Sequence, residues 1–306
     1  MPKITLYDTD RRPTSKFTLA LARGIVEENN RIGGTWEVKH RGIDHYLANG
    51  LNDIATGDAV CTLGILRGTG LLLKEAALRN IDYYYMDHAY FNPGYSGKGW
   101  MRITKNDHAC TTLRDISADR WNGFHKHHGY NNQPWKTNQE RGDIILICPP
   151  TNAVCWYFGL DLDWGEQIAH KLRTFLPPHD HSRIKIRRKP KEPIVDDKGN
   201  LIELRSYEQS GTLEDDLANA HCVIAYNSMV ALQATMMGIP VITGPHSCCT
   251  NVSFDLQLFE TQQHPSTFNT EPANRSRMLY WLASNQWKMK EIENGSAWRM
   301  LQENYS

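Results

Sequence analysis

The chain has 306 residues, with 34 basic and 34 acidic side chains and a formal net charge of zero. A hydrophobic content of 40% and a charged content of 22% are typical of a globular protein with room for two domains. Zero net charge excludes attraction of the whole molecule to nucleic acid or anionic membrane, so such a partner must be met by a local patch.

Localisation is predicted from the N-terminus and the cysteines. The first ten residues lack the apolar core of a signal peptide, and no apolar run is long enough to span a membrane. Seven cysteines at scattered spacings favour reduced thiols. We therefore expect a cytoplasmic protein without membrane insertion, in the host cytoplasm if a phage encodes it.

The first half of the chain alternates short apolar runs with helical patterns. Strands are expected at residues 4–7, 36–39, 59–63, 82–86 and 101–104, and helices from about residue 15 and at 71–78. This alternation predicts a parallel sheet with helices on its faces. Residues 91–141 are rich in Gly, His and Trp, and long segments of this kind are commonly functional loops.

The second half repeats this architecture. We expect strands at 144–148, 183–187, 222–225 and 241–243, and helices at 164–175, 215–220, 229–237, 274–285 and 289–301. The expected domains are therefore residues 1–138 and 139–306, each an α/β domain.

The segment 222–244 combines a strand, a polar turn, a helix and a further strand. Asn227 and Ser228 are good helix N-caps, and Gly238 suits the left-handed conformation that ends a helix. Backbone N–H groups at such a turn attract anions, so the turn is a candidate anion site. His246 and Ser247 follow the next strand and are expected to border it. The alternative is an ordinary α/β unit without a ligand.

Other candidates follow strand ends, where ligands bind in open α/β sheets. Asp87 and His88 follow the strand at 82–86, and either is a candidate general base. The alternative is that Asp87 caps the next segment and His88 satisfies a backbone carbonyl. Arg187 and Lys189 belong to the densest basic cluster and are candidates for phosphate binding, although a charge run is commonly a solvated edge.

A family resemblance is carried by three segments. The strand, Asn-Ser pair, small-residue helix and Gly-x-Pro-Val-Ile of residues 222–244 resemble the donor-binding half of GT-B glycosyltransferases. Residues 184–190, IKIRRKP, are similar to the basic strand segment of capsule-polysaccharide transferase relatives. The segment 286–298 resembles the ends of phage and capsule-locus proteins of this type.

The resemblance implies two Rossmann-like domains with a cleft between them. The N-terminal domain would bind the acceptor, and the C-terminal domain a nucleotide sugar such as a UDP-sugar, with terminal helices that cross back. The resembling proteins carry a similar Asp-His pair after this strand, which implies the base role. Many members have Glu where this chain has Gln233, a position that usually holds the donor ribose. No tightly bound cofactor is implied.

The expected activity is a hexosyl- or pentosyltransferase reaction onto a hydroxyl. The phage resemblance favours hydroxymethylated pyrimidine in DNA as acceptor, contacted by Arg67, Arg120, Trp121 and Lys126, since basic and aromatic side chains alternate at 120–136. The alternatives are a cytoplasmic transferase of cell-surface polysaccharide synthesis, a nucleotide-sugar isomerase on the same fold, and a noncatalytic binding protein.

Five histidines suggest a zinc site, but their spacings match no familiar motif: His125, His127, His128, His179 and His181. We therefore expect no metal site.

Overall fold

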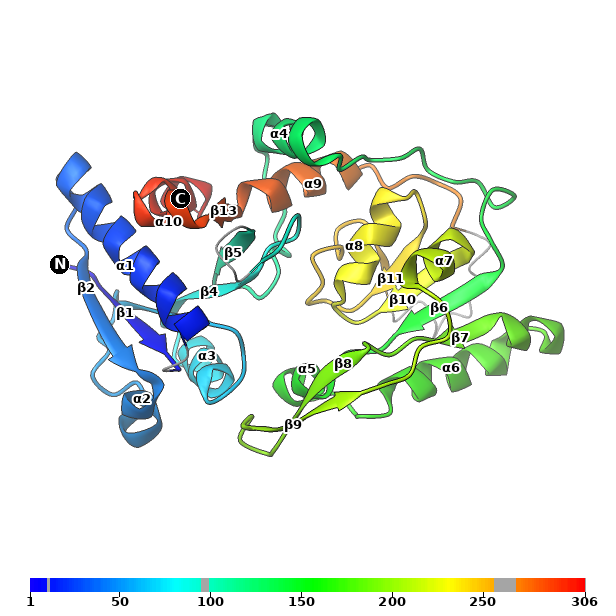
Figure 1. Ribbon diagram of the computed structural model, residues 1–306, viewed down its shortest axis with the longest axis horizontal. Helices are drawn as coiled ribbons and strands as arrows, with labels where there is room; N and C mark the ends of the chain where they lie inside the picture. Colours follow the sequence, from blue (N-terminus) through cyan, green and yellow to red (C-terminus); the bar gives the residue numbers. More distant parts are fainter. Residues whose placement is uncertain (10–11, 95–98, 256–267, 306) are drawn as a thin grey trace. The chain divides into compact units, whose positions relative to one another are not determined.

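The computed structural model describes residues 1–9, 12–94, 99–255 and 268–305, which form two compact units (Figure 1). Unit 1 comprises Met1–His108, Val195–Leu201 and Leu282–Ser306, and unit 2 comprises Ala109–Ile194 and Ile202–Trp281. Residues 109–138, which we expected in the N-terminal domain, thus group with unit 2, whereas the C-terminal residues from Leu282 group with unit 1.

Unit 1 contains, within the described residues, a six-stranded sheet in the order β13-β5-β4-β3-β1-β2. β1, β2, β3 and β4 are mutually parallel, β5 runs antiparallel to them, and β13, which pairs antiparallel with β5, runs in the direction of the four. The strands are β1 (Lys3–Asp8), β2 (Glu37–Gly42), β3 (Ala59–Leu63), β4 (Asp82–His88), β5 (Trp100–Lys105) and β13 (Gln286–Lys288).

The helices of unit 1 cover both faces of this sheet. They are α1 (Arg12–Ile32), α2 (Ile43–Asn49), α3 (Thr69–Leu78), α10 (Met289–Glu293) and α11 (Ser296–Tyr305). Leu6 belongs to the core under α1, whereas its neighbour Tyr7 packs edge-on against Tyr46 of α2, because successive side chains of a strand point to opposite faces.

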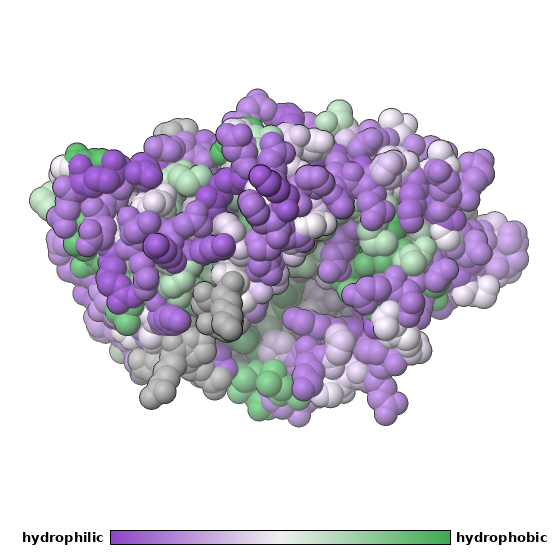
Figure 2. Space-filling view, turned by 45° about the horizontal axis from the view of Figure 1, so that its top comes forward, coloured by the Kyte–Doolittle hydropathy of each residue, from purple (hydrophilic) through white to green (hydrophobic). Residues whose placement is uncertain are grey.

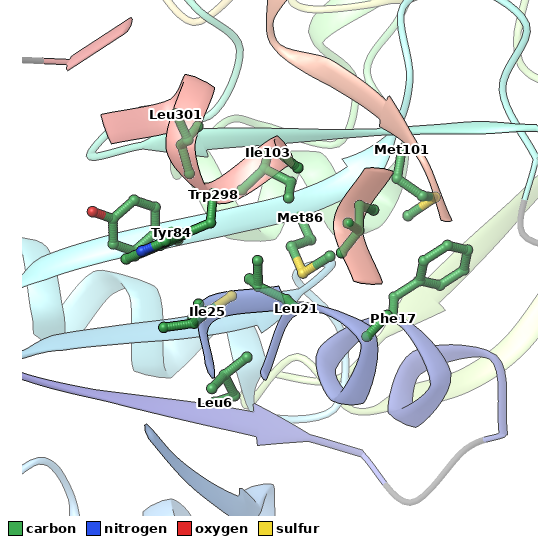
Figure 3. Packing of buried hydrophobic residues seen from close by; sticks show 14 of the residues in the cluster. Leu6, Phe17, Leu21, Ile25, Tyr84, Met86, Met101, Ile103, Trp298 and Leu301 are labelled. Carbon is green, nitrogen blue, oxygen red and sulfur yellow. The ribbon is translucent and has the colours of Figure 1, made fainter. Parts of the chain in front are cut away.

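The core of unit 1 lies between the sheet, α1 and the C-terminal helices. Figure 3 shows Phe17, Leu21 and Ile25 of α1 converging on strand residues such as Met86 and on Trp298. The expected helical spacing on α1 is confirmed. Gly24 permits the contact with α10, because a Cβ there would lie 1.9 Å from the carbonyl oxygen of Ile292.

Unit 2 contains, among the residues described, a parallel sheet in the order β12-β11-β10-β6-β7 and a separate ribbon of β8 and β9. Its strands are β6 (Ile144–Cys148), β7 (Ile184–Ile186), β8 (Lys191–Val195), β9 (Leu201–Ser206), β10 (Ala220–Ala225), β11 (Val241–Thr243) and β12 (Phe254–Asp255). Its helices are α4 (Asp119–His128), α5 (Asn152–Phe158), α6 (Trp164–Phe175), a 3₁₀ helix (Pro178–Arg183), α7 (Leu213–Ala218) and α8 (Met229–Met236), and α9 (Arg275–Ser284) continues into unit 1.

Three sequence predictions need correction. The expected strand 183–187 is shorter because Pro178 starts a 3₁₀ helix that extends through Arg183. The expected helix 289–301 is two helices, interrupted at Gly295, whose φ of +81° a side chain rarely adopts. Residues 119–128, expected to be loop, form α4, which buries Trp121 and Phe124.

A buried arginine connects separate parts of unit 2. Arg275 is 2% exposed, and its guanidinium donates to the carbonyl oxygens of Thr235 at 2.7 Å, Met236 at 3.2 Å and Gln133 at 2.7 Å. It also pairs with Glu271 at 2.9 Å and lies 5.4 Å from the ring centre of Trp135. Arg275 thus supplies donors to the last carbonyls of α8, which have no partner within the helix.

We expect Arg275→Met to lower the free energy of unfolding by about 3 kcal/mol, because three carbonyl oxygens each lose a charged donor and Glu271 loses its partner. Urea denaturation measures this loss. The control is Arg23→Met, which removes a 59% exposed arginine from a surface ion pair and is expected to cost about 0.5 kcal/mol or less. Equal losses in the two variants would contradict a special role for Arg275.

Candidate functional site

The strand ends of unit 2 form the first part of the candidate site. From β6 the chain first adds β7 on one side and later β10 on the other, so the strand order reverses between β6 and β10. Ligands of open α/β sheets bind outside the carboxyl ends of strands at such a reversal. Here β6 leads to Thr151, the N-cap residue of α5, and β10 leads to Asn227 and Ser228.

Ser228 is the N-cap of α8, as the sequence predicts. Its Oγ accepts a hydrogen bond from the backbone N–H of Val230 at 3.3 Å, and both Asn227 and Ser228 are half-buried. The first turn of α8 therefore begins at the strand ends, where its N–H groups and the helix dipole favour an anion. The helix ends at Gly238, whose φ of +75° is the expected left-handed conformation.

His246 and Ser247 follow β11 but have different environments. His246 is exposed and stacks on Phe158, with ring centres 4.4 Å apart, and also lies near Tyr226. Ser247 is fully buried, and its Oγ accepts from the backbone N–H of Cys249 at 3.1 Å. His246 is thus available to a ligand at the strand ends, whereas Ser247 shapes the turn.

The basic cluster after β7 is largely paired within the protein. Arg187 and Lys185 both contact the buried carboxylate of Asp216, at 2.7 and 2.6 Å. Arg187 also donates to the carbonyl oxygen of Gly211 at 3.1 Å. Lys189 is exposed at the surface. Asp216 therefore compensates one of these two positive charges, and Lys189 is the more accessible cation.

Gln233 lines a hollow of about 280 Å³ beside α8. Its side chain is exposed, and the hollow is bounded by α7, α8 and residues 129–133. The wall combines apolar and aromatic groups with amides and one carboxylate: Leu217, Met236, Met237, Tyr130, Asn131, Gln133 and Glu214. An apolar wall with a few polar groups is the usual composition of a small-molecule site.

A second hollow, of about 320 Å³, lies between α5 and the β8–β9 ribbon. Arg188, Glu192, Arg205 and Tyr207 contribute its charged and polar lining. Glu192 is buried and accepts a hydrogen bond from the Tyr207 hydroxyl at 2.7 Å, and Arg188 pairs with Glu166 at 2.7 Å. The polar groups of this hollow thus have protein partners.

In unit 1, Asp87 lies opposite Arg102 in the β4–β5 pair. Its carboxylate contacts Arg102 at 3.1 Å and accepts from the Tyr85 hydroxyl at 2.7 Å and from the backbone N–H of His88 at 2.8 Å. Burial alone would raise the pKa of Asp87, but the Arg102 charge and these hydrogen bonds outweigh it and hold the pKa below its ordinary value. The side chain of His88 is exposed.

The sequence analysis missed a second acid at the same edge of this sheet. Asp8, the last residue of β1, is buried, and its Oδ2 lies 2.9 Å from Nε2 of His40 on β2. Its position directly after the expected strand 4–7 was the available signal. Arg67, between β3 and α3, has a φ of +61°, and its backbone N–H donates to Gly199 at 3.0 Å.

The expected DNA-contact segment is only partly exposed. Trp121 is 7% exposed, and Arg120 is half-buried. Lys126 is exposed near the end of α4, together with His127 and His128. The ring of Trp121 therefore lies in the core, and the accessible part of this segment is basic rather than aromatic.

The described residues contain neither a cluster of metal-ligating side chains nor a membrane-spanning helix. Within the ranges stated above, no group of three or more His, Cys, Asp or Glu side chains is arranged to hold a metal ion. No helix among the same residues is long and apolar enough to cross a membrane. The face of the molecule in Figure 2 is mostly hydrophilic, with scattered hydrophobic residues.

Comparison with known proteins gives only distant likenesses. No family model and no curated protein matches the chain. Among solved structures it is similar to Thermosulfurimonas dismutans KpsC, beta Kdo 2,4 transferase, with a TM-score of 0.49 and 10% identity over 92% of this chain and 89% of that one. It is also similar to Thermosulfurimonas dismutans KpsC, beta Kdo 2,7 transferase, with a TM-score of 0.45 and 10% identity over 98% of this chain and 99% of that one. The likeness to E. coli heptosyltransferase WaaC with ADP has a TM-score of 0.22 and 13% identity over 99% of both chains. Scores this low assign no function to the chain.

We predict that Arg102→Met raises the pKa of Asp87, because the carboxylate keeps its burial but loses its counter-charge. A carbon-13 NMR titration of the carboxyl group measures this. Lys105→Met is the matched control, since Lys105 lies on the same strand but pairs with Asp82 at 2.8 Å. An unchanged Asp87 titration in Arg102→Met would show that Arg102 does not set this pKa.

The sign of the effect on stability follows from the lowered pKa of Asp87. A carboxyl whose pKa is lower in the folded state stabilises the fold above its unfolded pKa of about 3.9, and this contribution is lost as the pH falls through the folded value. Asp87→Asn is therefore expected to be less stable than the unchanged protein at pH 7, and the gap is expected to close in acid. A gap that persists at pH 2 would contradict this.

Proposed function

We propose that the protein is a GT-B-like glycosyltransferase that moves a sugar from a nucleotide-sugar donor to a hydroxyl. Unit 2 binds the donor, and unit 1 carries the acceptor and the general base. Two α/β units with ligand-type residues at their strand ends agree with this division of roles.

The observation that carries the proposal is the position of α8. Its N-terminus at Ser228 lies at the strand reversal of unit 2, and Gln233, farther along the same helix, lines the hollow bounded by Tyr130 and Glu214. The diphosphate would lie at the helix start, and the nucleoside in the hollow. Gln233 and Glu214 would then contact ribose hydroxyls, and the apolar wall the base.

The leaving diphosphate needs positive potential as its negative charge develops. The N–H groups of the first turn of α8 supply part of this, and Lys189 and His246 are accessible cation and hydrogen-bond groups. Arg187 also contributes positive potential. Its ion pair with Asp216 reduces the net charge at this point but fixes the position of the guanidinium. Asn227 and Ser247 shape the strand-end turns around this site.

The general base is His88 rather than Asp87. An effective base has a pKa near the working pH, whereas Arg102 and the Tyr85 hydroxyl hold the pKa of Asp87 low. Asp87 instead accepts from the backbone N–H of His88 and so fixes the end of β4. The imidazole of His88 is exposed and is able to accept a proton from an acceptor hydroxyl.

For the acceptor we propose a glycan of cell-surface polysaccharide synthesis. This choice is supported by the burial of Trp121, which removes the main stacking group from the expected DNA-contact segment. Hydroxymethylated DNA is the second candidate, favoured by the exposed Lys126, His127 and His128 near the end of α4, with Arg120 at the start of that helix and Arg67 on unit 1.

We expect Gln233→Ala to weaken binding of the preferred nucleoside diphosphate by roughly threefold to tenfold, the value of one or two hydrogen bonds. Calorimetric titration with a panel of nucleoside diphosphates measures this. Gln139→Ala, at another exposed glutamine of unit 2, is the control. Equal affinities of the two variants would show that the nucleoside does not bind in the hollow beside α8.

Turnover tests the reaction itself. Incubation with a nucleotide-sugar panel, alone, with oligosaccharides or with hydroxymethylated DNA, followed by mass spectrometry, is expected to give a glycosylated oligosaccharide. His88→Ala is expected to lower this rate about a hundredfold or more with donor binding retained, and Asp87→Asn by less. Modified nucleosides would identify DNA as acceptor, and isomerised donor without acceptor would replace the transferase proposal.

A further inference from the structure

The β8–β9 ribbon has a strand edge open to pairing. In the part of the chain that the structure describes, β9 has only β8 as a hydrogen-bonded neighbour. Its sequence, LIELRS, contains neither Gly nor Pro, the residues that usually interrupt pairing. A strand edge of this kind presents a row of backbone N–H and C=O groups to which another strand binds readily.

The direction of the backbone groups on β9 follows from its pairing with β8. The N–H of Tyr207 donates to the carbonyl oxygen of Pro190 at 2.9 Å, so Tyr207 faces β8. Counting back from Tyr207, the backbone groups of Ser206 point to the open edge, because these groups alternate between the two edges of a strand. At the turn, the N–H of Asp196 donates to the carbonyl oxygen of Asn200 at 3.0 Å, so Asn200 also faces β8 and the groups of Leu201 point to the open edge. Asn200 and Tyr207 are an odd number of residues apart, so the alternation shifts once between them, as at a β-bulge. The groups at the open edge are available to a further strand.

The two faces of β9 have different side chains. Arg205 and Tyr207 line the 320 Å³ hollow, so Ile202 and Leu204 point to the opposite face. Ile202 is 65% exposed and Leu204 is 66% exposed. Two aliphatic side chains close together on the ribbon are thus largely exposed and are able to make apolar contact with a further strand.

We infer that β9 pairs antiparallel with β9 of a second copy of this chain, about a two-fold axis at Leu204. Leu204 then lies opposite Leu204 of the second copy, Ile202 opposite Ser206, and Glu203 opposite Arg205. The same residues contribute from both copies, as in an isologous dimer. The backbone groups of β9 that point to the open edge form the new hydrogen bonds.

The charge order of β9 is what selects a second copy as the partner. In two antiparallel copies of β9 centred on Leu204, Glu203 of each copy lies opposite Arg205 of the other. Unlike charges therefore face each other twice, and such cross-strand pairs are favourable. Within one chain Glu203 and Arg205 already pair at 2.6 Å, but both side chains are about half exposed (49% and 52%), so this pair contributes little. Exchange of partners therefore costs little and adds strand pairing and apolar contact.

The expected dimer is weak. One short strand from each copy buries less area than a stable, standard-size interface needs. A dissociation constant in the range of about 10 to 100 µM is consistent with pairing of this extent. The dimer is therefore expected to form at high protein concentration and to dissociate on dilution.

Charge-reversal variants test the pairing by sedimentation equilibrium over about 5–300 µM. Glu203→Arg and Arg205→Glu each place like charges opposite each other twice, and each is expected to raise the dissociation constant about tenfold or more. The double variant Glu203→Arg/Arg205→Glu restores unlike pairs and is expected to return within about threefold of the unchanged protein. An equimolar mixture of the two single variants is expected to form heterodimers for the same reason.

Leucine variants supply the matched control. Leu204→Arg is expected to abolish the dimer, whereas Leu78→Arg, at an 84% exposed leucine on α3, leaves it unchanged. The inference is overturned if the unchanged protein is monomeric throughout this concentration range. It is equally overturned if the single reversals dimerise normally, or if neither the double variant nor the mixture restores association.

Discussion

The buried guanidinium of Arg275 is the contact on which the geometry of unit 2 depends. It supplies donors to the C-terminal carbonyls of α8 and to Gln133, so helix and preceding segment are fixed together. At the other end, the Ser228 side chain caps the same helix. With both ends fixed, Gln233 is held at a defined place on the wall of the hollow, and residues 129–133 form the opposite wall.

Periodicity was sufficient to predict most of the strands and long helices, because buried strands are continuous apolar runs and α1 and α6 bury one face. It failed where contacts distant in sequence decide the outcome. Trp121 and Phe124 suggest exposed aromatic residues in a loop, but in the structure both belong to α4 and are buried. The β8–β9 ribbon was missed because its exposed face lacks the alternation that marks a half-buried strand.

The candidate site was less predictable than the fold, because the partner of each charge is distant in the chain. Asp216 pairs with Arg187 from 29 residues away, and Arg102 fixes Asp87 from 15 residues away. In the sequence, Arg187 belongs to a basic cluster and Asp87 is an isolated acid. In the structure the first is a paired cation and the second a carboxylate with a low pKa, which changes the role that each is able to perform.

The two units differ in the chemistry that their strand ends offer. In unit 1 the polar groups at the carboxyl ends of the strands are the carboxylates of Asp8 and Asp87, each with a histidine beside it. Groups of this kind orient and exchange protons. In unit 2 the polar groups are the N–H groups at the start of α8 and the Ser228 hydroxyl, a type of site that favours negative charge. Glycosyl transfer to a hydroxyl requires both functions, a proton acceptor and a site for the departing phosphate. A protein that only bound a nucleotide would need the second alone, so the acidic and imidazole groups of unit 1 favour an enzyme over a binding protein.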